Sequence, residues 1–196
     1  AHQTNKEWKR TPFREVANTN WLIIGFGPIG IETAKRAKAF GATIDVIRRS
    51  PKTSEIVDRA GTMADLGKFV PDADVIVMAC ALNADTRKFA GEDFFTSVKE
   101  GAILVNIARG ALIEDSAMIA ALDRGQLAGA ALDVFDPEPL PTDNPLWDHP
   151  KVRLTAHTSF GGDGTRLRWD ELFFDNLPRY VRGETLLHEV SPADIV

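Results

Sequence analysis

Short, continuous apolar runs alternate with amphipathic stretches along most of this chain of 196 residues. Such runs are typical of strands covered on both faces, as parallel strands are in α/β proteins. The pattern predicts strands at 21–24, in a second run that ends at Arg48, and at 75–79, 103–105, 127–134 and 152–155, with helices at 28–40, 63–71, 92–100, 113–124 and 167–181. This alternation predicts a doubly wound parallel α/β sheet, with ligands bound beyond the carboxyl ends of its strands.

Two of the predicted helices carry more detailed expectations. The helix at 113–124 should place Ala117, Ala120 and Ala121 on one face. The helix at 167–181 contains Pro178, which should bend or restart it. Its apolar stripe consists of Trp169, Leu172, Phe173, Leu177, Tyr180 and Val181.

Two segments lack an apolar pattern of this kind. Residues 51–61 are polar and no element is predicted there. The lead-in at 1–20 is expected to be helical or irregular, with Trp8 and Phe13 as apolar anchors that could pack on a neighbour. It has no initiator Met and no apolar signal core, so it looks processed, tagged or cut from a longer chain.

A glycine turn follows the first predicted strand and opens the first helix. In this GxGxxG turn, Gly25 allows the tight turn, Gly27 lets backbone approach a pyrophosphate, and Gly30 lets helix and strand pack closely. Pro28 suits the first helical turn, and the helix N-terminus beside Ile29 would face the phosphates. The alternative is an ordinary glycine-rich turn, but strand, turn and helix together favour a dinucleotide-binding fold of the Rossmann type.

Composition and charge exclude several classes of protein. The chain is 44% hydrophobic and 26% charged, which is ordinary for a globular protein, and its net charge of −5 gives no reason to expect nucleic acid or an anionic membrane as partner. No apolar run approaches the length of a membrane span. Cys80 is the single cysteine, so an intrachain disulfide is excluded and a reducing, cytoplasmic location is expected. We expect no metal site.

The end of the second predicted strand should decide the choice of cofactor. An acidic residue there would bind the ribose hydroxyls of NAD, whereas a basic one would accept the 2′-phosphate of NADP. The chain has Arg48, Arg49 and Ser50 at this point, so we assign Arg48 to the discriminating position and expect NADP(H), with NAD as second choice. The alternative is an arginine pair on a solvated loop. Asp45 lies before the strand's end, and the pattern does not explain an acidic residue there.

Four ordered motifs carry a resemblance to a known family. They are GFGPIG at 25–30, VNIARGALIED at 105–115, ALDVFDPEPLP at 131–141 and NPLWDHPKVRLTAHTS at 144–159. With these motifs the chain resembles the nucleotide-binding domain of the D-isomer-specific 2-hydroxyacid dehydrogenases, and most nearly the NADP-dependent glyoxylate/hydroxypyruvate reductases among them. The resemblance extends from about residue 8 to about residue 187.

The resemblance implies a catalytic set of three residues. Arg109 would grip the carboxylate and carbonyl of the substrate, and a planar guanidinium can do so with two parallel hydrogen bonds. Glu138 and His157 would form the acid–base pair, because a neighbouring carboxylate stabilises a charged imidazole that can donate a proton. His2, His149 and His188 are expected to be structural. The presence of Glu138 argues against the formate dehydrogenase branch.

The resemblance also assigns further residues to the cofactor side. Asp133 would contact the nicotinamide carboxamide or ribose, although it could equally cap a turn. Cys80 and Ala81 replace the usual polar–proline pair over the nicotinamide, and Phe160 replaces a small residue after the histidine. The remaining assignments are Thr86, Ile107, Ala108, Arg109, His157 and Ser159.

The predicted function is hydride transfer between NADP(H) and a small 2-hydroxy or 2-oxo acid. The expected organisation is a lead-in at 1–12, a dinucleotide-binding domain at 13–183 and a segment at 184–196 that returns to a substrate lobe, which is largely absent here. The resemblance implies a homodimer. The alternatives are a non-catalytic, corepressor-like module that senses nucleotides and a degraded fragment without cofactor affinity.

Overall fold

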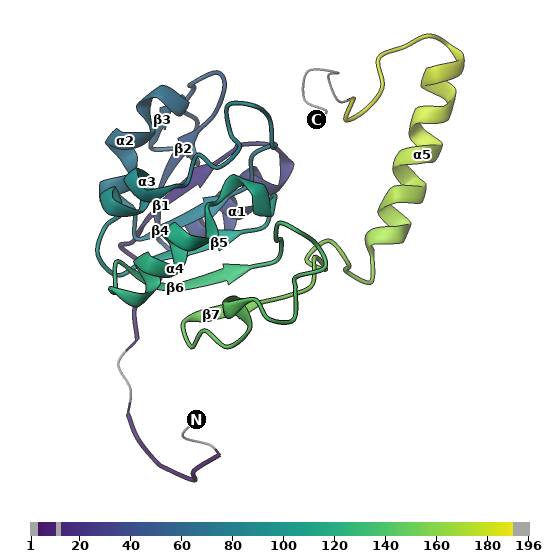
Figure 1. Cartoon of the computed structure of the whole chain (residues 1–196). Helices are drawn as coiled ribbons and strands as arrows, with labels where there is room; N and C mark the ends of the chain where they lie inside the picture. The colour runs from purple at the N-terminus through teal and green to yellow at the C-terminus, as the bar shows by residue number, and fades with distance from the viewer. Residues whose placement is uncertain (1–3, 11–12, 190–196) are drawn as a thin grey trace.

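Seven parallel strands form one sheet in the order β3-β2-β1-β4-β5-β6-β7 (Figure 1). The structure is a computed structural model that describes residues 4–10 and 13–189. The strands are β1 (Asn20–Ile24), β2 (Thr43–Ile47), β3 (Arg59–Gly61), β4 (Val75–Met78), β5 (Ala102–Asn106), β6 (Leu127–Leu132) and β7 (Val152–Leu154). The order reverses between β1 and β4, which is where a doubly wound sheet binds its ligand. The predicted fold class is confirmed.

Helices cover both faces of the sheet because its strands are apolar on both faces. The helices are α1 (Pro28–Ala39), α2 (Leu66–Phe69), α3 (Glu92–Ser97), α4 (Asp115–Asp123) and α5 (Thr165–Val181), with short 3₁₀ turns at Met63–Asp65, Val70–Asp72, Gly110–Leu112 and Pro145–Trp147. Leu22 and Ile24 of β1 belong to the core cluster that includes residues of α2, α3 and α4, whereas Ile23 belongs to the cluster with α1. The described residues include no helix that is long and apolar enough to cross a membrane.

The structure corrects three details of the predicted elements. The polar segment 51–61 contains the edge strand β3, which pairs with β2. The helix predicted at 113–124 begins at Asp115, and its buried residues are Met118, Ala121 and Leu122, whereas Ala120 is exposed. The helix predicted at 63–71 is a 3₁₀ turn, one α-helical turn and a second 3₁₀ turn.

Helix α5 stands away from the sheet (Figure 1). It continues through Pro178 without a restart, and none of its residues is buried. Its exposed apolar side chains are Leu167, Trp169, Phe173, Phe174, Leu177, Tyr180 and Val181. The predicted stripe therefore exists, but the described part of the chain does not cover it.

Before Asn20, which begins β1, the described part of the lead-in contains no helix or strand, and its first described residues run out from the body of the domain (Figure 1). Trp8 is 101% and Phe13 is 86% exposed, so neither side chain anchors the segment within the described chain. Residues 1–3, 11–12 and 190–196 of the predicted terminal segments lie outside the described residues.

Candidate active site

Two glycines of the turn, Gly25 and Gly30, lie close to other backbone atoms, whereas Gly27 faces open space. Gly25 has φ +97°, and a Cβ there would lie 2.4 Å from the backbone nitrogen of Cys80. A Cβ at Gly30 would lie 2.3 Å from the carbonyl oxygen of Gly25, so both positions need glycine for the fold itself. A Cβ at Gly27 would meet no atom within 4 Å. The space over Gly27 is therefore open to a ligand.

The same turn presents the N-terminus of α1. Pro28 is the first helical residue, and no side chain caps the helix. Free N–H groups and the helix dipole favour an anion at this point. The open glycine and the uncapped helix both fit a pyrophosphate, so the residues present suit a dinucleotide.

Arg48 follows β2 directly and is half-buried. Its guanidinium carbon lies 5.6 Å from the centroid of the Phe26 ring, over the glycine turn. Arg49 and Ser50 follow on the exposed part of the same loop. The predicted discriminating residue therefore lies beside the turn that would hold the pyrophosphate.

Asp45 is fully buried and is held by residues of neighbouring strands. Its Oδ1 accepts a hydrogen bond of 2.9 Å from Nε of Arg59, and its Oδ2 accepts hydrogen bonds of 2.5 Å from Nη2 of Arg59 and 2.9 Å from Nδ2 of Asn20. The contact with Asp45 is the largest contribution that raises the pKa of Arg59. The carboxylate thus belongs to an ion pair between β2 and β3, which explains an acidic residue inside a buried strand.

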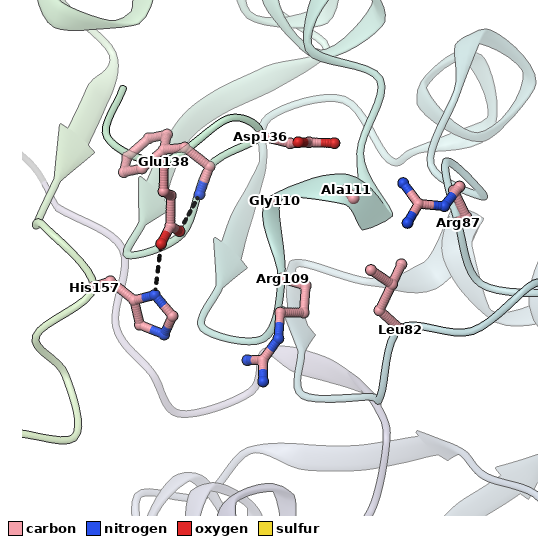
Figure 2. A pocket seen from close by; sticks show the side chains of 9 residues that line it. Leu82, Arg87, Arg109, Gly110, Ala111, Asp136, Glu138 and His157 are labelled. Carbon is pink, nitrogen blue, oxygen red and sulfur yellow. Dashed lines mark hydrogen bonds and ion pairs between the residues drawn. The ribbon is translucent and has the colours of Figure 1, made fainter. Parts of the chain in front are cut away.

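Arg109, Glu138 and His157 lie around one pocket of about 360 Å³ (Figure 2). Arg109 follows β5, Glu138 lies in the loop after β6 and His157 follows β7. The Nδ1 atom of His157 lies 2.8 Å from Oε2 of Glu138. The pocket is also lined by Leu82, Arg87, Gly110, Ala111, Phe135 and Asp136.

Two loops press together to bring Arg109 and Glu138 to the same pocket. A Cβ at Gly110 would lie 2.0 Å from the carbonyl carbon of Phe135, so the glycine after Arg109 permits this contact. The buried Asn106 shapes the first loop, because its Nδ2 donates to the carbonyl oxygen of Arg109 and its Oδ1 accepts from the N–H of Ala108. The motif at 105–115 contains Asn106, which ends a buried strand directly before Arg109, but its sequence alone did not assign it this role.

The charge of Glu138 is stabilised by its surroundings. Burial raises its pKa, but the N–H of Phe135, the hydrogen bond and charge of His157 and the charge of Arg109 together lower it below its usual value. Oε1 of Glu138 accepts the Phe135 N–H at 2.9 Å, which leaves Oε2 directed at His157. The site therefore holds a carboxylate beside an imidazole.

Asp133 holds the loop that carries His157. Its carboxylate accepts hydrogen bonds from Oγ1 of Thr155 at 2.5 Å, from N of Thr158 at 2.9 Å, and from N and Oγ of Ser159 at 3.1 and 2.6 Å. The backbone N–H of His157 donates to the carbonyl oxygen of Asp133 at 2.8 Å. Burial raises the pKa of Asp133, but these donors lower it to about 2. The geometry supports the turn-capping interpretation of this residue, and Ser159 serves as one of its donors.

Other residues assigned to the cofactor side lie on loops after the strands. Burial raises the pKa of the Cys80 thiol to about 11. Thr86 is buried, and its hydroxyl donates to the carbonyl oxygen of Ala81. Ile107 is half-buried and Ala108 is buried directly before Arg109. Their contacts with a cofactor stay predictions.

Sequence reasoning missed Arg87 and Asp136 as residues of the pocket. Arg87 follows Thr86, and Asp136 stands two residues before Glu138, so both adjoin positions that the motifs single out. Figure 2 shows both side chains at the edge of the pocket, opposite His157. The only signal for either residue was its neighbour in the sequence.

The glycine turn, the switch point and the pocket define a Rossmann-type dinucleotide-binding domain. Residues 1–159 match the model of the D-isomer specific 2-hydroxyacid dehydrogenase, NAD binding domain. The chain therefore belongs to the D-isomer specific 2-hydroxyacid dehydrogenase family, and the resemblance seen in its motifs is confirmed.

Two curated relatives and one solved structure illustrate the similarity. Over 155 residues, 79% of its length, the chain is 40% identical to 4-methyl-2-oxopentanoate reductase A of Aspergillus oryzae. Over 165 residues, 83% of its length, it is 37% identical to glyoxylate reductase of Korarchaeum cryptofilum. It spans 46% and 49% of these two proteins.

The structural similarity covers nearly the whole chain. The NADPH-dependent glyoxylate/hydroxypyruvate reductase of Sinorhizobium meliloti, solved with NADP and sulfate, superposes with a TM-score of 0.89 at 26% identity. This comparison covers 98% of the chain and 62% of the reductase.

Proposed function

We propose that this chain is the nucleotide-binding part of an oxidoreductase that transfers a hydride between NADP(H) and a small 2-oxo or 2-hydroxy acid. The observation that carries the proposal is the convergence of Arg109, Glu138 and His157 on one pocket at the carboxyl ends of the strands. Two relatives support the proposal by their names, since one is named as a reductase of 4-methyl-2-oxopentanoate and the other as a reductase of glyoxylate, and both compounds are 2-oxo acids.

Each of the three residues has a distinct task in this proposal. Arg109 binds the carboxylate of the substrate and polarises its carbonyl, because its guanidinium can form two parallel hydrogen bonds. During reduction, His157 donates a proton to the carbonyl oxygen, and in the reverse direction it accepts that proton. Glu138 keeps the imidazole oriented and stabilises its positive charge through the 2.8 Å contact. Bound nicotinamide cofactor supplies the hydride.

We propose NADP(H) rather than NAD(H) as the preferred cofactor. Arg48 follows the strand next to the glycine turn, and its positive charge suits a 2′-phosphate. Asp45 does not compete, because its carboxylate is bonded to Arg59 and Asn20. The NADP complex of the Sinorhizobium meliloti reductase supports the choice.

A second lobe completes the site in this proposal. Residues 13–183 form the dinucleotide-binding domain, and residues 184–196 return toward a substrate lobe of about a hundred residues, which is a common domain size. The exposed apolar side chains of α5 support this arrangement, since an apolar helix face of this kind is normally covered. Closure of the second lobe would exclude water from the pocket, so we expect the 196 residues alone to turn over 2-oxo acids poorly.

We further propose a homodimer, which the resemblance implies, and a cytoplasmic location. Trp8 and Phe13 are exposed in the lead-in and could contact the second copy. A reducing compartment suits the single Cys80. Analytical ultracentrifugation of the full-length protein, compared with a variant in which Trp8 and Phe13 are both replaced by serine, would test the dimer.

The function is tested by assaying the full-length protein with NADPH and a panel of glyoxylate, hydroxypyruvate and 4-methyl-2-oxopentanoate. We expect reduction of at least one acid, and Arg109→Ala should abolish it, while NADPH should still bind measurably because the glycine turn and Arg48 remain. A corepressor-like binding module would bind NADPH without turnover that depends on Arg109. A degraded fragment would bind neither NADPH nor NADH.

A further inference from the structure

Two arginines near the second strand lie over phenylalanine rings, but only one of them is engaged by carboxylates. Arg59 lies 5.1 Å from the centroid of Phe69, and its guanidinium is bonded to Asp45 and Asp72. Arg48 lies 5.6 Å from the centroid of Phe26, and within the described residues its side chain has no hydrogen-bond or ion-pair partner. The donors of Arg48 are therefore available for an anion, whereas those of Arg59 are used within the protein.

The Phe26 ring is a fixed surface for this guanidinium. Phe26 is half-buried and packs against the core cluster on the α1 side of the sheet. The N–H of Gly25 donates to the carbonyl oxygen of Ile47 at 2.9 Å, which ties the glycine turn to the end of β2. The N–H of Arg48 donates to the carbonyl oxygen of Gly61 at 2.9 Å, which ties the arginine backbone to β3. Both partners of the ring contact thus come from restrained backbone.

A guanidinium over an aromatic face is attracted by the ring quadrupole and keeps its edge N–H groups free to donate. The contact with the Phe26 ring already restricts the conformations of the Arg48 side chain. Less conformational entropy is therefore lost when Arg48 binds a phosphate, and this loss opposes association. We propose that Phe26 is a positioning residue for cofactor selectivity: its ring holds Arg48 ready for the 2′-phosphate of NADP(H). This inference rests on the NADP(H) preference proposed above.

The test measures dissociation constants of NADPH and NADH for the chain by quenching of tryptophan fluorescence, with calorimetry as a second method. The variants are Phe26→Leu, Phe26→Tyr, Arg48→Ala and the double variant Phe26→Leu/Arg48→Ala. Phe40→Leu is the matched control, because it makes the same change at an exposed phenylalanine of the same βαβ unit. Thermal unfolding of each variant reports whether the fold is intact.

We expect Phe26→Leu to weaken NADPH binding about fivefold, equivalent to about 1 kcal/mol, and to change NADH binding less than about twofold. Phe26→Tyr should retain the selectivity, since tyrosine presents a similar ring face. In the Arg48→Ala background Phe26→Leu should have no further effect on NADPH, because the two residues act as a unit.

Four results would overturn the inference. Equal weakening of NADPH and NADH by Phe26→Leu would show that the ring contacts the cofactor or shapes the turn in general. A full effect of Phe26→Leu without Arg48 would show that it does not act through the arginine. If Phe26→Leu did not change NADPH binding while Arg48→Ala still lost the selectivity, the NADP(H) preference would be supported, but the role of the Phe26 ring in holding Arg48 would be rejected. An unchanged NADPH to NADH ratio in Arg48→Ala would instead reject the preference itself, and the inference with it.

Discussion

The Nδ1 atom of His157 lies 2.8 Å from Oε2 of Glu138, across 19 positions of sequence. The second carboxylate oxygen is held by the N–H of Phe135, so Glu138 can direct only one oxygen to the imidazole. His157 itself has φ +52°, in the left-handed region, and the carbonyl of Asp133 holds its N–H. Both members of the pair are therefore oriented by backbone contacts of the loops that carry them.

Removing the charge of Glu138 while keeping the shape of its side chain should slow catalysis. In Glu138→Gln the amide oxygen can still accept the Phe135 N–H, but the charge beside His157 is lost. We expect kcat for 2-oxo acid reduction by the full-length protein to fall roughly 10²-fold, within the range for acid–base catalysis. Steady-state kinetics with NADPH would measure it.

Asp136→Asn is the matched control, because Asp136 lines the same pocket without a contact to His157 in the described structure. Its kcat should fall far less. Equal losses in the two variants would mean that the general negative charge of the pocket matters, and the specific pairing of Glu138 with His157 does not.

Two glycines of the turn, Gly27 and Gly30, should separate cofactor binding from folding. Gly27→Ala should fold normally, because its Cβ would meet no atom within 4 Å, but it should bind NADPH at least about tenfold more weakly, since the methyl group occupies the ligand's space. Gly30→Ala should destabilise the fold through its 2.3 Å clash with Gly25. Thermal unfolding and NADPH titration of both variants would measure the two effects. A Gly27→Ala protein with unchanged NADPH affinity would contradict the assignment of this turn.

The sheet and the glycine turn were predictable because their signals are local. The fully buried β4, for example, consists of four consecutive apolar residues. Strand β3 was not predictable, because its three residues Arg59, Ala60 and Gly61 lie at the edge of the sheet and carry no apolar run. The periodicity of α5 predicted an apolar face correctly, but a periodic pattern cannot name what covers that face.

The candidate site was predictable only through motifs that are far apart in the sequence. Local signals placed Arg109, Glu138 and His157 after strands, and the parallel sheet brings such positions to one edge. The partners of Asp133 were not predictable, since Thr155, Thr158 and Ser159 lie 22 to 26 positions away. The same holds for Asp45, whose partner Arg59 lies on the strand that the pattern missed.

Asp133 should contribute stability that depends on pH. Its folded pKa of about 2 lies below the ordinary value of 3.8, so the unfolded state binds more protons between these values and stability falls as pH decreases through them. We expect Asp133→Asn to lose about 2 kcal/mol of unfolding free energy at pH 7, and the difference from the unmodified chain to shrink from about pH 4 to about pH 2.

Urea unfolding across this pH range would measure the effect. Asp143→Asn, which removes an exposed carboxylate, should change stability by less than about 0.5 kcal/mol at pH 7. If the loss of unfolding free energy in Asp133→Asn stayed constant down to the lowest pH, altered packing or hydrogen-bond geometry would be responsible for it, and the charge of Asp133 would not contribute.

Replacing Arg59 should lower the stability of the fold, whereas replacing Arg48 should change the choice of cofactor. Arg59→Gln leaves the buried Asp45 carboxylate without its cation, which should cost about 2 kcal/mol of unfolding free energy, below the full value for a buried pair because Arg59 is half exposed. Its NADPH to NADH affinity ratio should not change.

Arg48→Gln should lower this affinity ratio and change the free energy of unfolding by less than about 0.5 kcal/mol. Urea unfolding and fluorescence titration would measure both quantities. If Arg59→Gln altered the ratio as Arg48→Gln does, then Asp45 and its partner would belong to the cofactor site, and assigning discrimination to Arg48 alone would be wrong.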